Sequence, residues 1–355
     1  MRQVLSMVFS ITMNMPGVLL ICLVAFLACQ AQNSMAEEVS GCGHPDLKSG
    51  TYTMDHGGLA RTYRVHIPRD YDAGKPAPLV LLFHGWGSNE DEFLDDRTVR
   101  QEANRRGYVL AAPRGLGSGE PDNSNNSWSF SGSTTGIDGA SNAICDAGKT
   151  PDYSYRSCAN VKQNSCSWTQ CQADDVAFSL ALVREIKSRL CVDEDRIYAS
   201  GGSNGGMLTW ELGQNPKSAP VFSAIAPIIG LPHRGYLDGP GKDGDLPVLL
   251  ITGTLDNVVP PGNWDDETFT TTSNDNDRYY YTGATAITRV WAKAHGCDTS
   301  VNAAPVEVGL QVPDCRTWCT SDTGVPRVLD CRAPMGHTYD FSWSWKLVMN
   351  FFDHH

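Results

Sequence analysis

Short, almost continuously apolar runs separated by helical patterns are the feature that most constrains the fold of this chain. The runs "PLVLLF" (78–83), "YVLAAP" (108–113) and "LPVLLIT" (246–252) have no polar face. "RIYAS" (196–200) and "SAIAPIIG" (223–230) have the same character. Strands of this composition are buried on both faces, as the central strands of parallel sheets are. The alternation predicts an α/β fold with a mostly parallel central sheet and helices on both faces.

One of the intervening segments shows a clear helical period. In "ADDVAFSLALVREIKSRL" (173–190) apolar residues recur three to four positions apart, which predicts an amphipathic helix. Asp174 and Asp175 fall in its first turn, where carboxylates complement the helix dipole. A paired-carboxylate site is the alternative, but the helix start already explains both residues. The predicted buried face consists of Val176, Leu180, Val183 and Leu190.

The stretch "YASGGSNGGM" (198–207) places one serine among four glycines. Gly201, Ser203 and Gly205 fit the pattern G-x-S-x-G between the strand "RIYAS" and the apolar run "MLTWEL". This strand–turn–helix context is what a nucleophile elbow requires, and the glycines let backbone pack closely around a serine at positive φ. A plain glycine-rich turn is the alternative. We predict that Ser203 is a nucleophile.

A serine nucleophile needs a general base, and the base needs an acid to orient it. In enzymes built around such an elbow, the acid follows the serine in the sequence and the histidine follows the acid. Asp256, in "VLLITGTLDNVVP", follows a buried strand and is the predicted acid. The alternative is that Asp256 is only a turn residue before Val258. Asp266 and Asp277 are weaker substitutes because no strand precedes them.

Four histidines are candidates for the base: His84, His233, His295 and His337. His337, in "RAPMGHTYDFSW", follows the strand-like "VLDC" and precedes a final helix, so a loop can place its ring over the elbow. It is the predicted base. His295 lies in a helical pattern and is predicted as a cap or surface residue, and His233 as a polar-loop residue without a role.

The segment "LLFHGWGSN" (81–89) ends the most apolar strand and predicts part of an oxyanion hole. Acyl transfer needs N–H donors aimed at the developing oxyanion. The backbone N–H of Asn204, directly after the serine, is one predicted donor, and that of Trp86 is the second. His84 is predicted as a structural hydrogen-bonding residue.

The N-terminus predicts export. Arg2 is followed by the apolar run "GVLLICLVAFLAC" (17–29) and then by small and polar residues, which is typical of a secretory signal peptide over 1–36. The run is shorter than the roughly 20 residues that span a bilayer, so no stable membrane anchor is expected. We expect one catalytic domain over 37–355. The formal net charge of −12 argues against a nucleic-acid partner.

Twelve cysteines are present, two of them in the predicted leader. An even number of cysteines in an exported chain predicts up to five disulfides, with the pairing open. Their spacing does not fit zinc ligands, and no metal or cofactor is expected. Residues 115–172 hold four cysteines in a long polar insertion, which predicts a disulfide-stapled, ordered loop. A second polar insertion covers about 261–284. The ten cysteines outside the predicted leader are Cys42, Cys145, Cys158, Cys166, Cys171, Cys191, Cys297, Cys315, Cys319 and Cys331.

With these residues placed, the chain resembles the secreted α/β-hydrolases that include feruloyl esterases and poly(3-hydroxybutyrate) depolymerases. The matching pieces include "RTYRVHIPRDYD", "PLVLLFHGWGSNEDEF", "RIYASGGSNGGM", "ITGTLDNVVP" and "MGHTYDF", in family order. The resemblance implies an α/β-hydrolase fold with the same nucleophile, acid, base and oxyanion donors. The motif "MGHTYDF" lacks the tryptophan–proline pair that often follows the histidine in relatives. The insertion 115–172 is longer than the resemblance implies.

The expected function is a secreted, cofactor-free serine ester hydrolase, and the resemblance favours a feruloyl esterase acting on plant cell-wall polysaccharide. One alternative is a poly(3-hydroxybutyrate) depolymerase or another polyester or aryl esterase, which would need an open apolar surface around the serine. A second alternative is a catalytically inactive hydrolase fold that serves as a binding protein. The partner expected from either enzyme is an ester substrate, and the oligomeric state stays open.

Overall fold

The computed structural model describes residues 40–118, 124–150, 155–158, 166–264, 271–272, 278–321 and 323–355. Ser40–His355 form one compact unit. The predicted leader, 1–36, lies outside the described residues, and so do Asp266 and Asp277.

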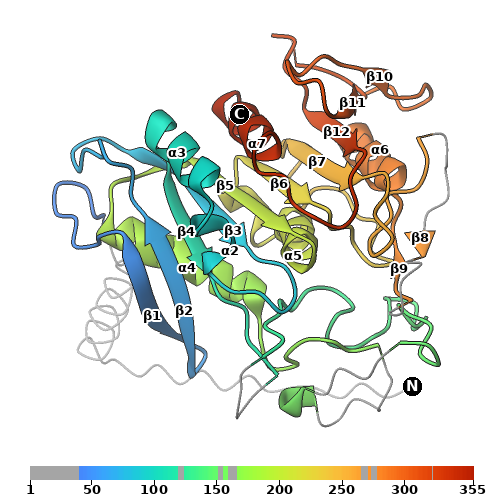
Figure 1. The fold of residues 1–355 in the computed structure, drawn as a ribbon, viewed down its shortest axis with the longest axis horizontal. Helices are drawn as coiled ribbons and strands as arrows, with labels where there is room; N and C mark the ends of the chain where they lie inside the picture. Colours follow the sequence, from blue (N-terminus) through green and yellow to red (C-terminus); the bar gives the residue numbers. More distant parts are fainter. Residues whose placement is uncertain are drawn as a thin grey trace, which may run out of the picture. The chain divides into compact units, whose positions relative to one another are not determined.

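A ten-stranded sheet runs through this unit (Figure 1). Its six central strands are parallel to one another, and antiparallel strands extend it at both edges. The five apolar runs of the sequence coincide with β3 to β7, so the predicted α/β-hydrolase fold is confirmed. In sheet order the strands are β1 (Gly50–His56), β2 (Leu59–His66), β4 (Val109–Pro113), β3 (Ala77–Phe83), β5 (Val192–Gly202), β6 (Ala224–Ile228), β7 (Val248–Gly253), β12 (Val328–Ala333), β11 (Asp314–Thr317) and β10 (Ala304–Pro305).

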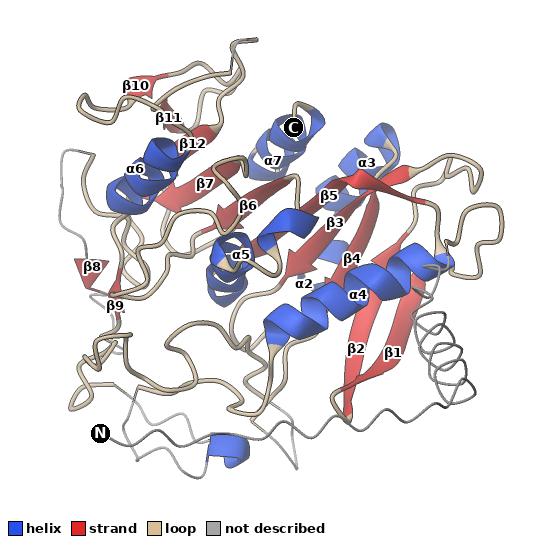
Figure 2. Ribbon diagram, turned by 180° about the vertical axis from the view of Figure 1, so that it is seen from behind, coloured by secondary structure: helices blue, strands red, loops and turns tan. Residues whose placement is uncertain are grey.

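Helices cover both faces of the sheet (Figure 2). One face carries α2 (Asp91–Leu94), α3 (Arg97–Arg106) and α7 (Ser344–Asp353), and the other carries α4 (Asp175–Arg189), α5 (Asn204–Gln214) and α6 (Ala284–Ala294). Each face buries its own apolar cluster. The remaining elements are the short 3₁₀ turns η1 (Arg156–Cys158) and η2 (Ala219–Val221) and the separate two-stranded sheet β8 (Thr271–Thr272) and β9 (Tyr280–Tyr281).

The inner face of α4 agrees with the prediction at Val183 and Leu190, which are buried, and differs from it at Val176 and Leu180. Val176 and Leu180 are partly exposed, whereas Phe178, Leu182 and Ile186 are fully buried. The reason is Asp175, whose carboxylate pairs with the guanidinium of a buried arginine on β2 and turns this side of the helix inward. A charged residue on the buried face is invisible to an argument based on hydrophobic periodicity.

Five disulfides use all ten cysteines of the compact unit, which confirms the disulfide prediction and supplies the pairing. Two of them lie wholly within the insertion 115–172, and a third joins the segment before β1 to the start of β5. The pairs are Cys42–Cys191, Cys145–Cys166, Cys158–Cys171, Cys297–Cys319 and Cys315–Cys331.

The two polar insertions contact each other. Tyr280 N–H donates to the carbonyl of Ile144 over 2.8 Å, and Asp146 N–H donates to the carbonyl of Arg278 over 3.0 Å. Cys145 forms a bridge with the neighbouring Tyr279. Segments more than 130 residues apart in the sequence therefore build one wall.

His233 is the centre of an aromatic cluster in this wall. Its ring is fully buried and stacks on Tyr281 and Phe130, with centroids 5.3 and 5.6 Å away. Trp168 and Tyr279 complete the cluster. The prediction of a polar-loop residue without a role is therefore wrong, because the aromatic residues that bury His233 come from insertions distant in the sequence. Burial lowers the pKa of His233 to about 3.

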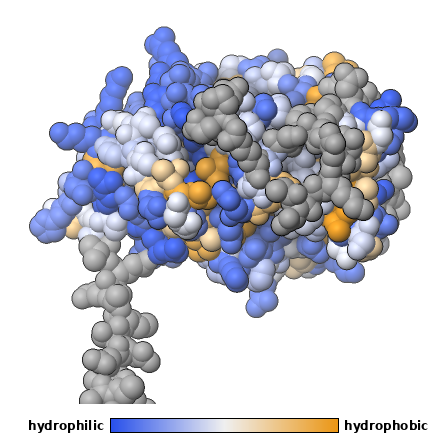
Figure 3. Space-filling view, turned by 90° about the horizontal axis from the view of Figure 1, so that it is seen from below, coloured by the Kyte–Doolittle hydropathy of each residue, from blue (hydrophilic) through white to orange (hydrophobic). Residues whose placement is uncertain are grey.

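Hydrophobic side chains are scattered on the outside of the unit. On the face shown in Figure 3, the coloured surface is mostly hydrophilic, and hydrophobic atoms gather in small patches. Within the described ranges, we find no helix with the length and apolar character needed to cross a bilayer. Among the described residues, the exposed large hydrophobic ones are Ile137, Leu255, Val301 and Val312.

The burial of His233 predicts how stability depends on pH. Its folded pKa of about 3 lies below the unfolded value of about 6.5. The unfolded chain therefore binds the extra proton first, and the free energy of unfolding falls as pH decreases below about 6.5. His233→Phe, which keeps an aromatic ring, should reduce this slope by up to about 1.4 kcal/mol per pH unit. Urea denaturation between pH 5 and 6.5 measures it, and an unchanged slope would contradict the prediction.

Candidate active site

Ser203 lies in a sharp turn between β5 and α5. Its backbone has φ +53° and ψ −118°, and its N–H donates to the carbonyl of Ile228 over 2.8 Å. A Cβ on Gly205 would lie 2.0 Å from the carbonyl oxygen of Phe83, and one on Gly201 would lie 2.4 Å from the carbonyl oxygen of Gly205. Only glycine fits at these two positions, and the absence of a Cβ there lets the turn pack directly against the end of β3.

Ser203, His337 and Asp256 form a chain of hydrogen bonds. The Oγ of Ser203 donates to Nε2 of His337 over 2.8 Å, and Nδ1–H of His337 donates to Oδ2 of Asp256 over 2.7 Å. Asp256 is buried, and its Oδ1 accepts from the N–H groups of Val258 and Val259. The structure thus brings together the three residues that the sequence predicts as nucleophile, base and acid.

The topology explains why residues so distant in sequence meet. Asp256 follows β7 and His337 follows β12, and these two strands are parallel neighbours. Ser203 follows β5, which is two strands from β7. The carboxyl ends of parallel strands lie at one edge of the sheet, where α/β folds place their sites.

The turn after β3 runs beside Ser203. A Cβ on Gly85 would lie 3.6 Å from Cβ of Ser203. The predicted donor Trp86 directly follows Gly85 and lines the same cavity as Ser203. The indole Nε1 of Trp86 donates to the hydroxyl of Tyr155 over 3.0 Å. Asn204, the other predicted donor, is the first residue of α5, and the first N–H groups of a helix have no acceptor within the helix.

His84 is held by backbone on both ring nitrogens. Its Nδ1–H donates to the carbonyl of Gly85 over 2.7 Å, and its Nε2 accepts from the N–H of Gly115 over 2.9 Å. Burial lowers the pKa of His84 to about 4. A neutral ring with both nitrogens occupied cannot take a proton from Ser203, so His84 has the structural role that we predict.

The sequence reasoning missed Glu92 and Tyr339. Both oxygens of Glu92 lie 3.2–3.3 Å from the N–H of Gly85, and its carboxyl also bonds to Tyr339. Burial raises the pKa of Glu92 and holds that of Tyr339 well above its usual range. A Cβ on Gly202 would lie 2.1 Å from the Tyr339 ring, so this tyrosine packs directly against the elbow. Tyr339 stands two residues after His337 in the sequence, and this position could have indicated that it lies in the site.

A cavity of about 370 Å³ opens onto Ser203 and His337. Glu92, Tyr339 and Trp86 line one part of it, and aromatic side chains from the two insertions line another. The aromatic part consists of Trp168, Tyr279 and Tyr281. This size suits a small organic molecule.

A cofactor or metal site is not apparent in the part of the chain that the structure describes. In those residues no group of three or more His, Cys, Asp or Glu side chains is placed to hold a metal ion. The ten cysteines of the compact unit are all consumed by disulfides.

Comparisons with known proteins point to esterases. No family model matches the chain. A probable feruloyl esterase C of Aspergillus niger is 25% identical over 62% of this chain and 63% of that protein, and one of Aspergillus flavus is 22% identical over 79% and 89%. An acetyl xylan esterase from Aspergillus awamori has the same fold, with a TM-score of 0.52 and 13% identity over 86% of this chain and 100% of that one. The match thus spans slightly less than two thirds of the Aspergillus niger relative.

The chain has the fold of the α/β-hydrolases, and its relatives support a carboxylic ester hydrolase. The chain resembles feruloyl esterases at 22–25% identity, so the resemblance carried by its motifs is confirmed.

The contact between Gly205 and β3 gives a direct test of the elbow. Gly205→Ala forces a methyl group into the carbonyl of Phe83, so we expect the free energy of unfolding to fall by about 1–3 kcal/mol. Urea denaturation measures the change. Gly139→Ala is the control, because a Cβ there meets no atom within 4 Å. Equal stability of the two variants would show that the packing argument is wrong.

Proposed function

We propose that the chain is a secreted serine esterase that releases hydroxycinnamic acids, such as ferulic acid, from plant cell-wall polysaccharide. Ser203 is the nucleophile, His337 the general base and Asp256 the residue that fixes the imidazole. The observation that carries the proposal is the unbroken hydrogen-bond chain from Ser203 Oγ to Asp256 Oδ2 at the floor of a cavity.

The geometry supports an acyl-enzyme mechanism. Ser203 Oγ attacks the ester carbonyl while its proton passes to Nε2 of His337. The resulting oxyanion accepts hydrogen bonds from the backbone N–H groups of Trp86 and Asn204. His337 then gives the proton to the leaving alcohol, and the acyl group stays on Ser203. A water molecule, deprotonated by His337, attacks the carbonyl of this ester. The bond from the acyl carbon to Ser203 Oγ then breaks, His337 returns the proton to Oγ, and the acid leaves. Asp256 stays ionised and stabilises the imidazolium.

An aromatic acyl group is the substrate that suits the cavity. Trp168, Tyr279 and Tyr281 give it an aromatic wall, and aromatic rings pack favourably against one another. The relatives' names, probable feruloyl esterase C, describe the same class of acyl group.

A polyester substrate is the second candidate. It would be favoured by a flat apolar surface around the serine, whereas Ser203 opens into a cavity with a carboxyl and a tyrosine hydroxyl in its lining. A catalytically inactive binding protein has no need to keep Ser203, His337 and Asp256 in hydrogen-bonding register, so we favour the enzyme.

Secretion is proposed from the disulfides together with the predicted leader. Five disulfides persist only in an oxidising compartment. We propose that 1–36 is removed on export and that 37–355 act as one catalytic domain.

The deciding experiment is hydrolysis of methyl ferulate and of a 3-hydroxybutyrate oligomer by the purified protein. Turnover of methyl ferulate should fall about 10⁴-fold or more in Ser203→Ala, because the nucleophile is lost. An unchanged melting temperature and disulfide content in the variant serve as the folding control. Turnover of the oligomer alone would move the chain to the polyester candidate, and undiminished activity in Ser203→Ala would overturn the serine mechanism.

The aromatic wall predicts selectivity for the acyl group. Trp168→Ala should lower kcat/KM for methyl ferulate about tenfold or more, while kcat/KM for 4-nitrophenyl acetate, whose acyl group is too short to reach the wall, stays within about threefold. Trp318→Ala is the matched control, since this tryptophan does not line the cavity. A parallel loss on both esters in Trp168→Ala would contradict an acyl-binding wall.

A further inference from the structure

The turn after β3, here called the oxyanion turn (84–88), is hydrogen-bonded to the disulfide-rich insertion. The N–H of Gly87 donates to the carbonyl of Asn126 over 2.8 Å, and Nδ2 of Asn126 donates to the carbonyl of Ser88 over 2.7 Å. On the other side of the turn, Nε1 of Trp128 donates to the carbonyl of His84 over 2.8 Å. Two side chains of one short segment therefore hold the turn before and after Trp86.

A third residue of the insertion reaches the turn at its centre. The hydroxyl of Tyr155 accepts from Nε1 of Trp86 over 3.0 Å and donates to the carbonyl of Asn125 over 2.7 Å. Tyr155 directly precedes η1, whose Cys158 is bonded to Cys171. The side chain of Trp86 is thus tied to the same segment that holds the backbone on either side of it.

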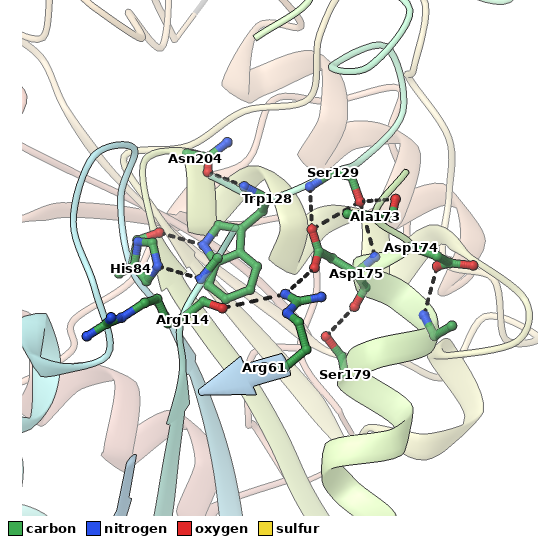
Figure 4. A network of polar contacts seen from close by, with 12 residues as sticks. Arg61, His84, Arg114, Trp128, Ser129, Ala173, Asp174, Asp175, Ser179 and Asn204 are labelled. Carbon is green, nitrogen blue, oxygen red and sulfur yellow. Dashed lines mark hydrogen bonds and ion pairs between the residues drawn. The ribbon is translucent and has the colours of Figure 1, made fainter. Parts of the chain in front are cut away.

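The segment 125–129 is itself fixed at its far end (Figure 4). The N–H of Trp128 donates to Oδ1 of Asn204 over 2.8 Å, and the N–H of Ser129 donates to Oδ2 of Asp175 over 2.6 Å. Asp175 in turn pairs with Arg61 over 2.6 Å, with both side chains at most 1% exposed. The segment therefore connects the first residue of α5 with the oxyanion turn and is anchored to β2 and α4.

We propose that Trp128 and Asn126 are positioning residues, which hold the oxyanion turn so that the N–H of Trp86 points at the developing oxyanion. The inference rests on the proposed serine mechanism and adds the insertion 115–172 to it. Asn204 takes part in both, because its backbone N–H is the other proposed oxyanion donor and its side-chain oxygen accepts from the N–H of Trp128. One segment thus sets the spacing between the two donors.

This role has a kinetic signature. The oxyanion exists only in the transition state and the tetrahedral intermediate, so a donor that is out of place lowers kcat and leaves substrate binding unchanged. Removal of a complete oxyanion donor costs about 10²–10³-fold in kcat. A donor that is displaced rather than removed should cost less, about 10- to 100-fold.

Trp128→Phe removes the indole N–H and keeps a ring against Phe83, with which Trp128 makes an edge contact at 5.3 Å. Asn126→Ala removes the bond to Ser88 and leaves the backbone bond to Gly87. For both variants we expect kcat for methyl ferulate to fall about 10- to 100-fold, while KM stays within about twofold of the value for the parent enzyme. The inhibition constant of phenylboronic acid, whose serine adduct places a boronate oxygen in the oxyanion hole, should rise in parallel.

Trp291→Phe is the matched control. Trp291 is as buried as Trp128, its Nε1 also donates to a backbone carbonyl, that of Asp238 over 3.0 Å, and it also makes an edge contact with a ring. We expect its kcat and its inhibition constant to stay within about twofold of the parent enzyme. Urea denaturation shows whether the two phenylalanine variants lose similar stability.

Two outcomes overturn the inference: a loss in Trp128→Phe no larger than in Trp291→Phe, or a loss expressed in KM with an unchanged inhibition constant. Failure of the serine mechanism is separate, because it appears as retained turnover in Ser203→Ala whatever the other variants do.

Discussion

The buried ion pair between Asp175 and Arg61 is the constraint on which the site depends. Both side chains are withdrawn from water, and the carboxylate also accepts from the N–H and the hydroxyl of Ser129. A buried carboxylate that lost its cation would be uncompensated, which costs about 3–5 kcal/mol. The guanidinium also lies 3.7 Å over the ring of Phe178. The segment 125–129 is therefore held at the start of α4, and there it also lies along the oxyanion turn.

The parts of the site that follow from local sequence could be predicted. Ser203 is marked by glycines that no side chain can replace, and Asp256 and His337 each follow a strand of the central sheet. Neighbouring parallel strands deliver such residues to one edge whatever lies between them in the sequence. The apolar runs mark the strands for the same reason, since burial on both faces leaves no place for polar residues.

The parts of the site that depend on contacts between distant segments could not be predicted from the sequence. His233 reads as a loop residue until aromatic side chains of both insertions close around it. Asp175 reads as a helix-start carboxylate until Arg61 of another strand is placed beside it. Glu92 and Tyr339 meet only because the loop after β12 folds over the elbow. Cysteine spacing likewise indicates that bonds form but leaves open which partners they join.

The position of Cys158–Cys171 brings a covalent bond close to the oxyanion turn. This bond closes a loop of the insertion next to Tyr155, whose hydroxyl accepts from Nε1 of Trp86. A reductant that opens this one bond would therefore loosen the loop beside Trp86 while the ladder hydrogen bonds of β3 and β5 remain.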